Sequence, residues 1–410
     1  MLVEHFQLIF VDYTAQEYFE KNGAIHFPDA HSNIMKACIR YLSFGIFRQN
    51  WDFHDVLKTQ LKQNALLDYA ASRWGDHARC QKNKEQDDET LILGFLRDDQ
   101  RIECVVRVLR ADFCHPIVSD ISRMHLCAYF GLVNTIQCLV KDGDDPDDPD
   151  SYGRTPLSIA AERGHDAVVK LLLEYGVRAN TKDIMGQTPL SAAAKEGYVE
   201  VAQMLLNHDG TEVDSMDTRE RTPLSLAAES GCKDVVQLLV THHDVKVDSK
   251  DKEGRTPLSF AAESGSKDVV QLLLTHEDVE VNSADKDGRT PLSFAAGRSS
   301  WEEGSKEIVE LLLKCNDVQV DSTDENGRTP LSYAAEQGSK DVIQLLLTCD
   351  DVKVNSTDKD GRTPLSFAVA RDSWKEGSKE IVELLLRCDD VQVDLADKNG
   401  RTPLSFAAEW

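Results

Sequence analysis

Six residues that can bind a metal recur through the second half of the sequence at intervals of 34 or 39 residues. They are His208, His242, His276, Cys315, Cys349 and Cys388. A zinc ion needs ligand atoms at about 2.0–2.3 Å, whereas packed helices lie about 8–10 Å apart. Each residue would offer one ligand to its own level of a stack, and His243 adds a neighbour but no third ligand. We therefore predict no metal site, and we expect these residues near helix C-termini, where a charged His complements the dipole.

The densest acidic segment runs from Asp142 to Asp150 and reads DGDDPDDPD. It lacks the Asp-x-Asp-x-Asp-Gly spacing and the closing Glu of a calcium loop. A solvated loop is the prediction here, and a loose attraction for calcium is the alternative.

Nucleophilic catalysis finds no support in the residue pattern. Twelve His and many Ser guarantee some Ser–His–Asp combination by number alone, but no Gly-x-Ser-x-Gly elbow occurs. One Ser does recur, eight times, directly after Thr-Pro-Leu. Because a catalytic residue is not needed eight times, we predict no catalytic residue, no cofactor and no enzyme.

Charge and composition exclude several further classes. The 410 residues carry 46 Lys plus Arg against 71 Asp plus Glu, a formal charge of −25. Binding to nucleic acid or to an anionic membrane depends on cations, so neither partner is expected. No apolar stretch reaches the roughly 18 residues of a membrane span, and the start has no basic segment of a secretory signal. Ten scattered cysteines without a CxxC pair suit a reducing compartment, so we expect a cytoplasmic or nuclear protein.

A repeated tripeptide organises most of the chain. Thr-Pro-Leu begins at Thr155, Thr188, Thr222, Thr256, Thr290, Thr329, Thr363 and Thr402. A degenerate copy begins at Ser122, which gives nine units, the last of them incomplete. Two units are five residues longer than the others because of an insertion between their expected helices. Recurrence at this period indicates a repeat architecture.

Each unit predicts a pair of helices. In one copy, Asp251–Arg255 has turn composition, Thr256 suits a helix N-cap and Pro257 suits the first helical position. Gly265 ends this helix, and a second one follows with apolar residues at helical spacing. Neither helix can bury its apolar side alone, so the units are expected to stack into an all-α solenoid.

These residues resemble ankyrin repeats over about residues 120–410. The motif is Asp-x-x-Gly-Arg-Thr-Pro-Leu-Ser-x-Ala-Ala followed by Val-Val-x-Leu-Leu-Leu. The resemblance implies a scaffold for protein–protein recognition, in which the turn tips and first helices line the binding groove. Two departures stand out: Ser replaces the His that usually follows Thr-Pro-Leu, and Glu220 replaces the turn Gly of one unit. We expect the turn at Glu220 to bend differently, because Gly tolerates positive φ more readily.

Residues 1–115 lack the repeat and are predicted to be helical. Ile34, Ala37, Cys38, Tyr41 and Leu42 fall on one helical face, and the polar stretch 81–89 is predicted to be a loop.

Two strings in this segment, 11–19 (VDYTAQEYF) and 65–78 (ALLDYAASRWGDHA), resemble the connector between the NTPase and the ankyrin array of fungal NACHT–ankyrin proteins. The resemblance implies a winged-helix-like remnant in a protein of the NOD-like receptor type. The phosphate-binding loop of such an NTPase, Gly-x-x-x-x-Gly-Lys-Ser/Thr, does not occur in this sequence.

Candidate binding residues lie at the expected turn tips and in the two insertions. Exposed apolar and aromatic side chains often anchor interfaces. The candidates are Tyr152, Ile184, Met185, Arg219, Glu253, Asp287, Asn326, Asp360, Asn399, Trp301 and Trp374.

The sequence thus predicts a helical connector, 1–115, followed by an ankyrin-repeat solenoid, 116–410. The expected function is non-catalytic protein recognition, as the sensor part of a NACHT-type signalling system. One alternative is an ankyrin-containing transcriptional regulator, and the −8 charge of residues 1–150 counts against it. Another is part of a full-length NTPase receptor whose motor is absent from this chain.

Overall fold

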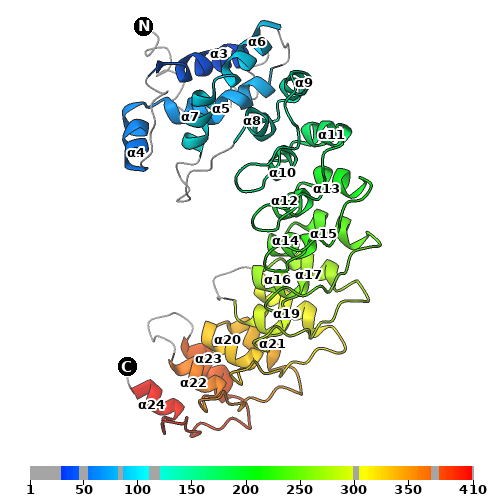
Figure 1. The fold of residues 1–410 in the computed structure, drawn as a ribbon. Helices are drawn as coiled ribbons and strands as arrows, with labels where there is room; N and C mark the ends of the chain where they lie inside the picture. Colours follow the sequence, from blue (N-terminus) through cyan, green and yellow to red (C-terminus); the bar gives the residue numbers. More distant parts are fainter. Residues whose placement is uncertain are drawn as a thin grey trace. The chain divides into compact units, whose positions relative to one another are not determined.

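The computed structural model describes residues 29–45, 54–81, 86–109, 121–298, 304–370 and 378–408, and these residues form helices and turns without a strand (Figure 1). Their contacts divide the chain into two compact bodies, Met1–Ile184 and Met185–Trp410, which are described separately. The boundary predicted near residue 115 falls within residues 110–120, which lie outside the described residues. It stays a prediction.

The N-terminal body contains a helical segment and the first two repeats. The helices of the segment are α3 (Ala30–Leu42), α4 (His54–Gln63), α5 (Leu67–Arg79), α6 (Gln86–Leu96) and α7 (Asp99–Leu109). The repeats contribute α8 (Arg123–Phe130), α9 (Val133–Lys141), α10 (Pro156–Glu162) and α11 (Asp166–Glu174).

Trp74 on α5 is the centre of this body. Its side chain is fully buried, and its ring lies 5.3 Å from Phe95 of α6 and 5.0 Å from Phe130 of α8, measured between ring centroids. Gly75 lets α5 approach α8 closely, because a Cβ at this position would come within 2.1 Å of the Phe130 ring. The helical segment therefore packs directly on the first repeat through aromatic contacts.

Two expectations for this segment were wrong in detail. The buried face of α3 consists of Met35, Cys38, Ile39 and Leu42, whereas Ile34 is only partly covered. The polar stretch 81–89 is not a loop throughout, because α6 already begins at Gln86. Its first turn is acidic, which stabilises a helix N-terminus, and the buried Asp88 carboxylate pairs with Lys36 on α3 at 2.6 Å.

The C-terminal body contains the remaining repeats. Its helices are α12 (Pro189–Glu196), α13 (Val199–Leu206), α14 (Pro223–Glu229), α15 (Lys233–Val240), α16 (Pro257–Ser264), α17 (Lys267–Leu273), α18 (Pro291–Ala296), α19 (Ser305–Leu313), α20 (Pro330–Gln337), α21 (Lys340–Leu346), α22 (Pro364–Ala370), α23 (Ser378–Leu386) and α24 (Pro403–Ala408).

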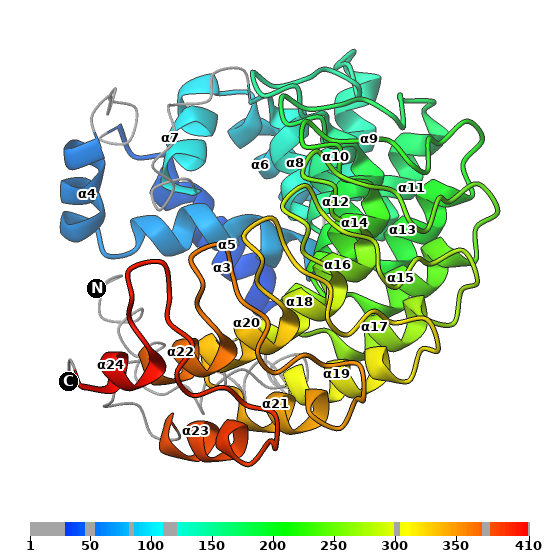
Figure 2. The same ribbon diagram turned by 90° about the horizontal axis from the view of Figure 1, so that it is seen from below.

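These helices stack in two rows. Each first helix packs on the first helix of the next repeat, from α12 through α24, and each second helix packs on the next second helix, from α13 through α23 (Figure 2). The solenoid expected from the sequence is confirmed. Among the described residues, no helix is both long and apolar enough to cross a membrane.

The Thr-Pro-Leu-Ser motif starts each first helix as predicted. Thr256 has extended backbone and its Oγ1 accepts a hydrogen bond from the Ser259 N–H at 3.3 Å, with Pro257 in the first turn. The two hydroxyls of Thr256 and Ser259 also lie 3.2 Å apart and are buried. The serine therefore closes the cap within its own repeat.

The degenerate first repeat shows what the usual His would add. His125 stands at the position of Ser259, and its Nδ1 lies 2.8 Å from the Ser122 hydroxyl. Its Nε2 lies 3.0 Å from the backbone carbonyl of Arg154 in the second repeat. The longer side chain thus bridges two repeats, a link that the shorter serine cannot reach.

Candidate protein-binding surface

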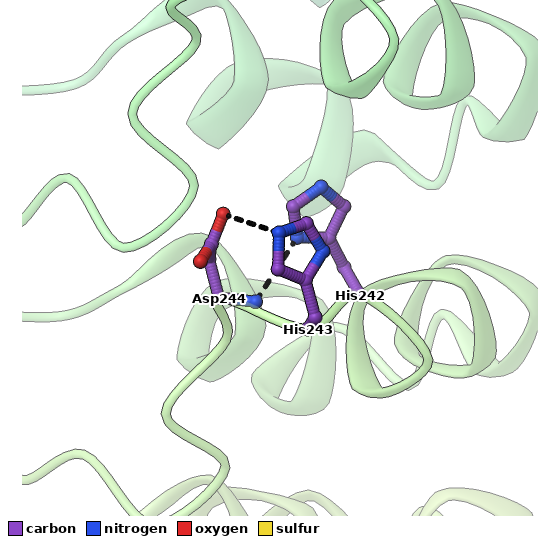
Figure 3. A group of neighbouring side chains, drawn as sticks. All are labelled: His242, His243 and Asp244. Carbon is purple, nitrogen blue, oxygen red and sulfur yellow. Dashed lines mark hydrogen bonds and ion pairs between the residues drawn. The ribbon is translucent and has the colours of Figure 1, made fainter.

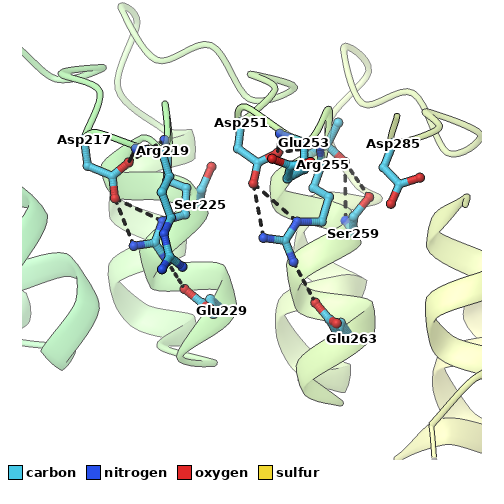
Figure 4. Close-up of polar contacts among 12 residues, drawn as sticks. Asp217, Arg219, Ser225, Glu229, Asp251, Glu253, Arg255, Ser259, Glu263 and Asp285 are labelled. Atoms are coloured by element: carbon cyan, nitrogen blue, oxygen red, sulfur yellow. Dashed lines mark hydrogen bonds and ion pairs between the residues drawn. The ribbon is translucent and has the colours of Figure 1, made fainter. Parts of the chain in front are cut away.

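Most repeats begin with a finger, an Asp-x-x-Gly-Arg turn or a close variant of it that precedes the first helix, and a buried Asp organises the turn. Asp251 Oδ1 accepts hydrogen bonds from the backbone N–H groups of Glu253 at 2.9 Å and Arg255 at 2.8 Å. Asp251 Oδ2 accepts from the Arg255 guanidinium at 3.2 and 3.3 Å (Figure 4). A buried carboxylate with this many charge-assisted partners fixes the turn.

In the later fingers, the Arg ties the turn to the first helix. Arg255 lies 4.3 Å above the Phe260 ring and donates to Glu263 at the end of α16 at 3.2 Å (Figure 4). Arg221 reaches Glu229 of α14 in the same way, at 2.8 Å. The Arg thus makes both a cation–π contact and an ion pair with side chains of the first helix.

Consecutive fingers are joined through their backbones. The Arg219 carbonyl accepts from the Lys252 N–H at 2.8 Å, and the Glu253 carbonyl accepts from the Lys286 N–H at 2.7 Å. The carbonyls of other predicted tip residues do the same, namely Tyr152, Met185, Asp287, Asn326 and Asp360. The main chain at each tip therefore holds the row together, which leaves the side chains for recognition.

The side chains of most predicted tip residues are exposed. Ile184 is 57% and Met185 48% exposed. Arg219, Glu253, Asp287, Asn326, Asp360 and Asn399 are also exposed, whereas Tyr152 is half-buried beside Arg154. Trp301 and Trp374 lie outside the described residues.

Two acidic tips are already engaged by their own fingers. The Asp287 carboxylate lies 3.2 Å from Arg289, and the Asp360 carboxylate lies 3.4 Å from Arg362. Such exposed pairs are weak, but a partner has to compete with them.

Met216 was missed by the sequence reasoning. It is 40% exposed and directly precedes Asp217, the first residue of a finger. That finger adjoins the finger of Met185, because the Thr218 N–H donates to the Met185 carbonyl at 2.8 Å. A signal was present, because the equivalent residues in later repeats are small or polar, namely Lys250, Ala284, Thr323, Thr357 and Ala396. Met185 and Met216 therefore form an apolar interruption in a charged row, which we call the methionine tips.

The six stacked His and Cys residues sit near the ends of second helices, as expected. Cys315 Sγ donates to the Leu311 carbonyl of its own helix at 3.7 Å, and burial raises its pKa. Cys349 and Cys388 show the same bond and the same direction of shift. A raised pKa disfavours the thiolate that binds metals.

The expectation that His242 and His243 lack a third ligand was wrong. Ligand atoms of His242, His243 and Asp244 all lie within 4.8 Å of one another (Figure 3). They are nevertheless engaged within the loop: His243 Nε2 lies 3.1 Å from Asp244, and His242 Nδ1 accepts the Asp244 N–H at 3.4 Å. The two rings are stacked at an interplanar angle of 21°, so their in-plane lone pairs do not converge as a tetrahedral ion requires.

The acidic run is a loop, as predicted, but three of its carboxylates are held in ion pairs. Asp144 pairs with Arg123 at 2.5 Å, Asp147 with Arg178 at 2.6 Å, and Asp150 with Arg154 at 2.7 Å. These three carboxylates are largely shielded from solvent. The Asp147–Arg178 pair joins the first repeat to the second, whereas Asp150 and Arg154 pair within one turn.

Comparison with known proteins agrees with the geometry. A family model that describes three consecutive ankyrin repeats matches the chain at residues 124–217, 210–285, 277–358, 299–391 and 351–410. The chain is 45% identical over 58 residues to the human transient receptor potential cation channel subfamily A member 1, and this match covers 13% of the chain and 5% of the channel. It is 36% identical over 52 residues to mouse Rabankyrin-5, which covers 13% of the chain and 4% of that protein.

A solved structure resembles the chain as well. The crystal structure of the human ASB11 ankyrin repeat domain is 26% identical with a TM-score of 0.49, and the match covers 55% of this chain and 97% of that one. The family match alone spans more than half of the chain, from residue 124 to residue 410. The chain therefore belongs to the ankyrin-repeat family.

Proposed function

We propose that this chain is a non-catalytic recognition module whose finger tips bind another protein. Ankyrin repeats bind other proteins, and the fold is typically an interaction module. The observation that carries the proposal is that the backbone carbonyls of the tips join the fingers, while most of the tip side chains are exposed. The methionine tips supply the apolar anchor that interfaces favour, within an otherwise charged row.

The test is capture of a partner by the immobilised full chain, followed by isothermal titration of the purified partner. A saturable complex of fixed stoichiometry is expected. Failure of every cellular protein to bind, while circular dichroism shows a folded array, would contradict the proposal.

The finer context we propose is a NACHT-type signalling system, in which residues 1–115 connect the array to a signalling partner. The support is the resemblance of strings 11–19 and 65–78 to the family's connector. The first string lies outside the described residues, and the second forms most of α5, with Trp74 packed against the first repeat. A coupled connector is the arrangement that a sensor needs in order to pass on binding at the array.

The encoding sequence next to this chain offers the direct test of that context. A reading frame upstream with Gly-x-x-x-x-Gly-Lys-Ser/Thr would support it. A different upstream domain without that loop would contradict it.

A further inference from the structure

The loops that follow the second helices are joined by one side chain per repeat, and that side chain is either Asn or Asp. Where it is Asn, it makes two bonds to the next repeat. Asn282 donates to the Asp317 carbonyl at 2.6 Å and accepts from the Gln319 N–H at 2.8 Å. Asn355 repeats this pair with the Asp390 carbonyl and the Gln392 N–H, at 2.7 and 2.8 Å.

Where the side chain is Asp, only the accepting half of this bridge is present. Asp214 accepts from the Lys246 N–H at 2.9 Å, and Asp248 accepts from the Glu280 N–H. The Oδ1 atoms of Asp214 and Asp248 are buried and have no hydrogen-bond partner among the described residues. Position 248 corresponds to Asn282 in the repeat, and Asp278 corresponds to Asp317. An Asn at position 248 would therefore donate to the Asp278 carbonyl. An ionised carboxylate cannot donate to a carbonyl, so this bond is missing.

The charged neighbours distinguish Asp248 from the other two. Asp214 is attracted by Lys246, and Asp321 has the Lys353 ammonium at 3.6 Å and the Ser356 hydroxyl at 3.4 Å. Asp248 faces the Glu280 carboxylate of the next loop, and the positive charge that attracts it is Lys250 of its own loop. The Asp278 side chain lies 3.8 Å from His276.

We propose that Asp248 is a protonation switch between the fourth and fifth repeats. In mildly acidic solution its carboxyl group takes up a proton and its O–H donates to the Asp278 backbone carbonyl, which completes the bridge that Asn282 and Asn355 make permanently. The proton comes from solvent and no other bond changes. When Asp248 is protonated, the additional hydrogen bond holds the loops after α15 and α17 together more firmly. It also restricts the distance between the fingers on either side of this junction.

The electrostatics favour this state at an accessible pH. Burial, and then the Glu280 carboxylate, raise the pKa of Asp248 to about 6. Because the folded pKa lies above that of the unfolded chain, about 3.9, the stabilising contribution is fully present below pH 3.9 and is lost as the pH rises through 6.

The variant Asp248→Asn mimics the protonated form with almost no change in shape, and Asn already occupies positions 282 and 355. At pH 8 we expect it to unfold with an equilibrium constant roughly tenfold lower than the natural chain, a value discounted for solvent screening. This gap should narrow as the pH falls below 6 and close only near pH 3.9. A second variant, Glu280→Lys, copies the loops at Lys246 and Lys353 and should move the transition well below pH 6.

Urea titration of the full chain from pH 8 to pH 5 measures the gap, and hydrogen exchange of peptides covering residues 276–284 shows whether the change is local. The expected result is protection of these loops that rises with acidity in the natural chain and is constant in Asp248→Asn. A gap independent of pH, or an Asp248→Asn chain less stable at pH 8, would overturn the proposal. So would a Glu280→Lys chain that keeps its transition near pH 6.

Discussion

At the level of single residues, Glu220 is the clearest departure from the repeat. It occupies the turn position that Gly254 holds in the next unit, and its φ of 61° makes it the one described non-glycine residue with positive φ. The expectation of a differently bent finger was wrong, because Asp217 accepts from the backbone of Arg219 and Arg221 as Asp251 does in its own finger. The network imposes the standard turn and Glu220 bears the strain.

Replacing Glu220 with Gly should therefore stabilise the array. A left-handed conformation costs a non-glycine residue about 1–2 kcal/mol, part of which is offset by the greater freedom of Gly in the unfolded chain. We expect a gain of about 1 kcal/mol in the free energy of unfolding, measured by urea titration.

The reverse change, Gly254→Glu, provides the matched control. It should destabilise, because φ at Gly254 is 81° and a Cβ there would lie 3.1 Å from the Lys286 backbone nitrogen. Equal stability of both variants and the natural chain would show that the turn relaxes without strain.

At the level of elements, the sequence predicted the first helices well because their signals are local. Thr, Pro and Ser at fixed spacing determine where each helix begins. Two ion pairs of the acidic run were not predicted because their partners lie far along the chain, as Arg123 does from Asp144. The sequence predicted the face of α3 that contains Ile34, but the buried face contains Met35 and Ile39. Packing against other helices decides which face is buried, and periodicity alone does not determine it.

The helix caps offer a test at this scale. Thr256→Ala removes a fully buried hydroxyl that accepts the Ser259 N–H, so we expect a loss of about 1–2 kcal/mol in the free energy of unfolding. Thr256→Ser keeps the hydroxyl and should lose clearly less. Thermal or urea unfolding of both variants distinguishes them, and equal losses would mean that packing of the Thr methyl group, not capping, is what matters.

At the level of the whole molecule, the two bodies should respond to acid in opposite ways. Burial, and then the nearby His31 ring, lower the pKa of His77 in the N-terminal body to about 4. Because the unfolded chain takes up this proton near pH 6.5, the N-terminal body loses stability as the pH falls from 6.5 to 4. Asp248 acts in the other direction in the C-terminal body.

His77→Gln should flatten the acid response of the N-terminal body. Gln can still bond to the Tyr69 hydroxyl, which lies 2.8 Å from His77 Nε2, but it does not titrate. Hydrogen exchange of α3 and α5 at pH 7 and pH 5, corrected for intrinsic rates, measures the effect. An unchanged difference between the two pH values would assign the response to other groups.

The sequence located the finger tips because each lies within a recurring turn motif. The exposure of their side chains could be determined only from the folded structure. Tyr152 was expected to anchor a partner but is half-buried, and Met216 emerged only from its exposure beside Met185. The choice of which tips a partner contacts depends on the surface that consecutive repeats build together, and no single motif encodes that surface.

The most direct test of recognition by the finger tips is the affinity of a captured partner for the double variant Met185→Ser, Met216→Ser. Tyr198→Ser is the control, since Tyr198 is 37% exposed at the start of α13 and away from the fingers. We predict at least a tenfold loss of affinity for the double variant, which corresponds to about 1.4 kcal/mol, with unchanged circular dichroism and an unaltered control. Full affinity in the double variant, or an equal loss in Tyr198→Ser, would contradict recognition through the methionine tips.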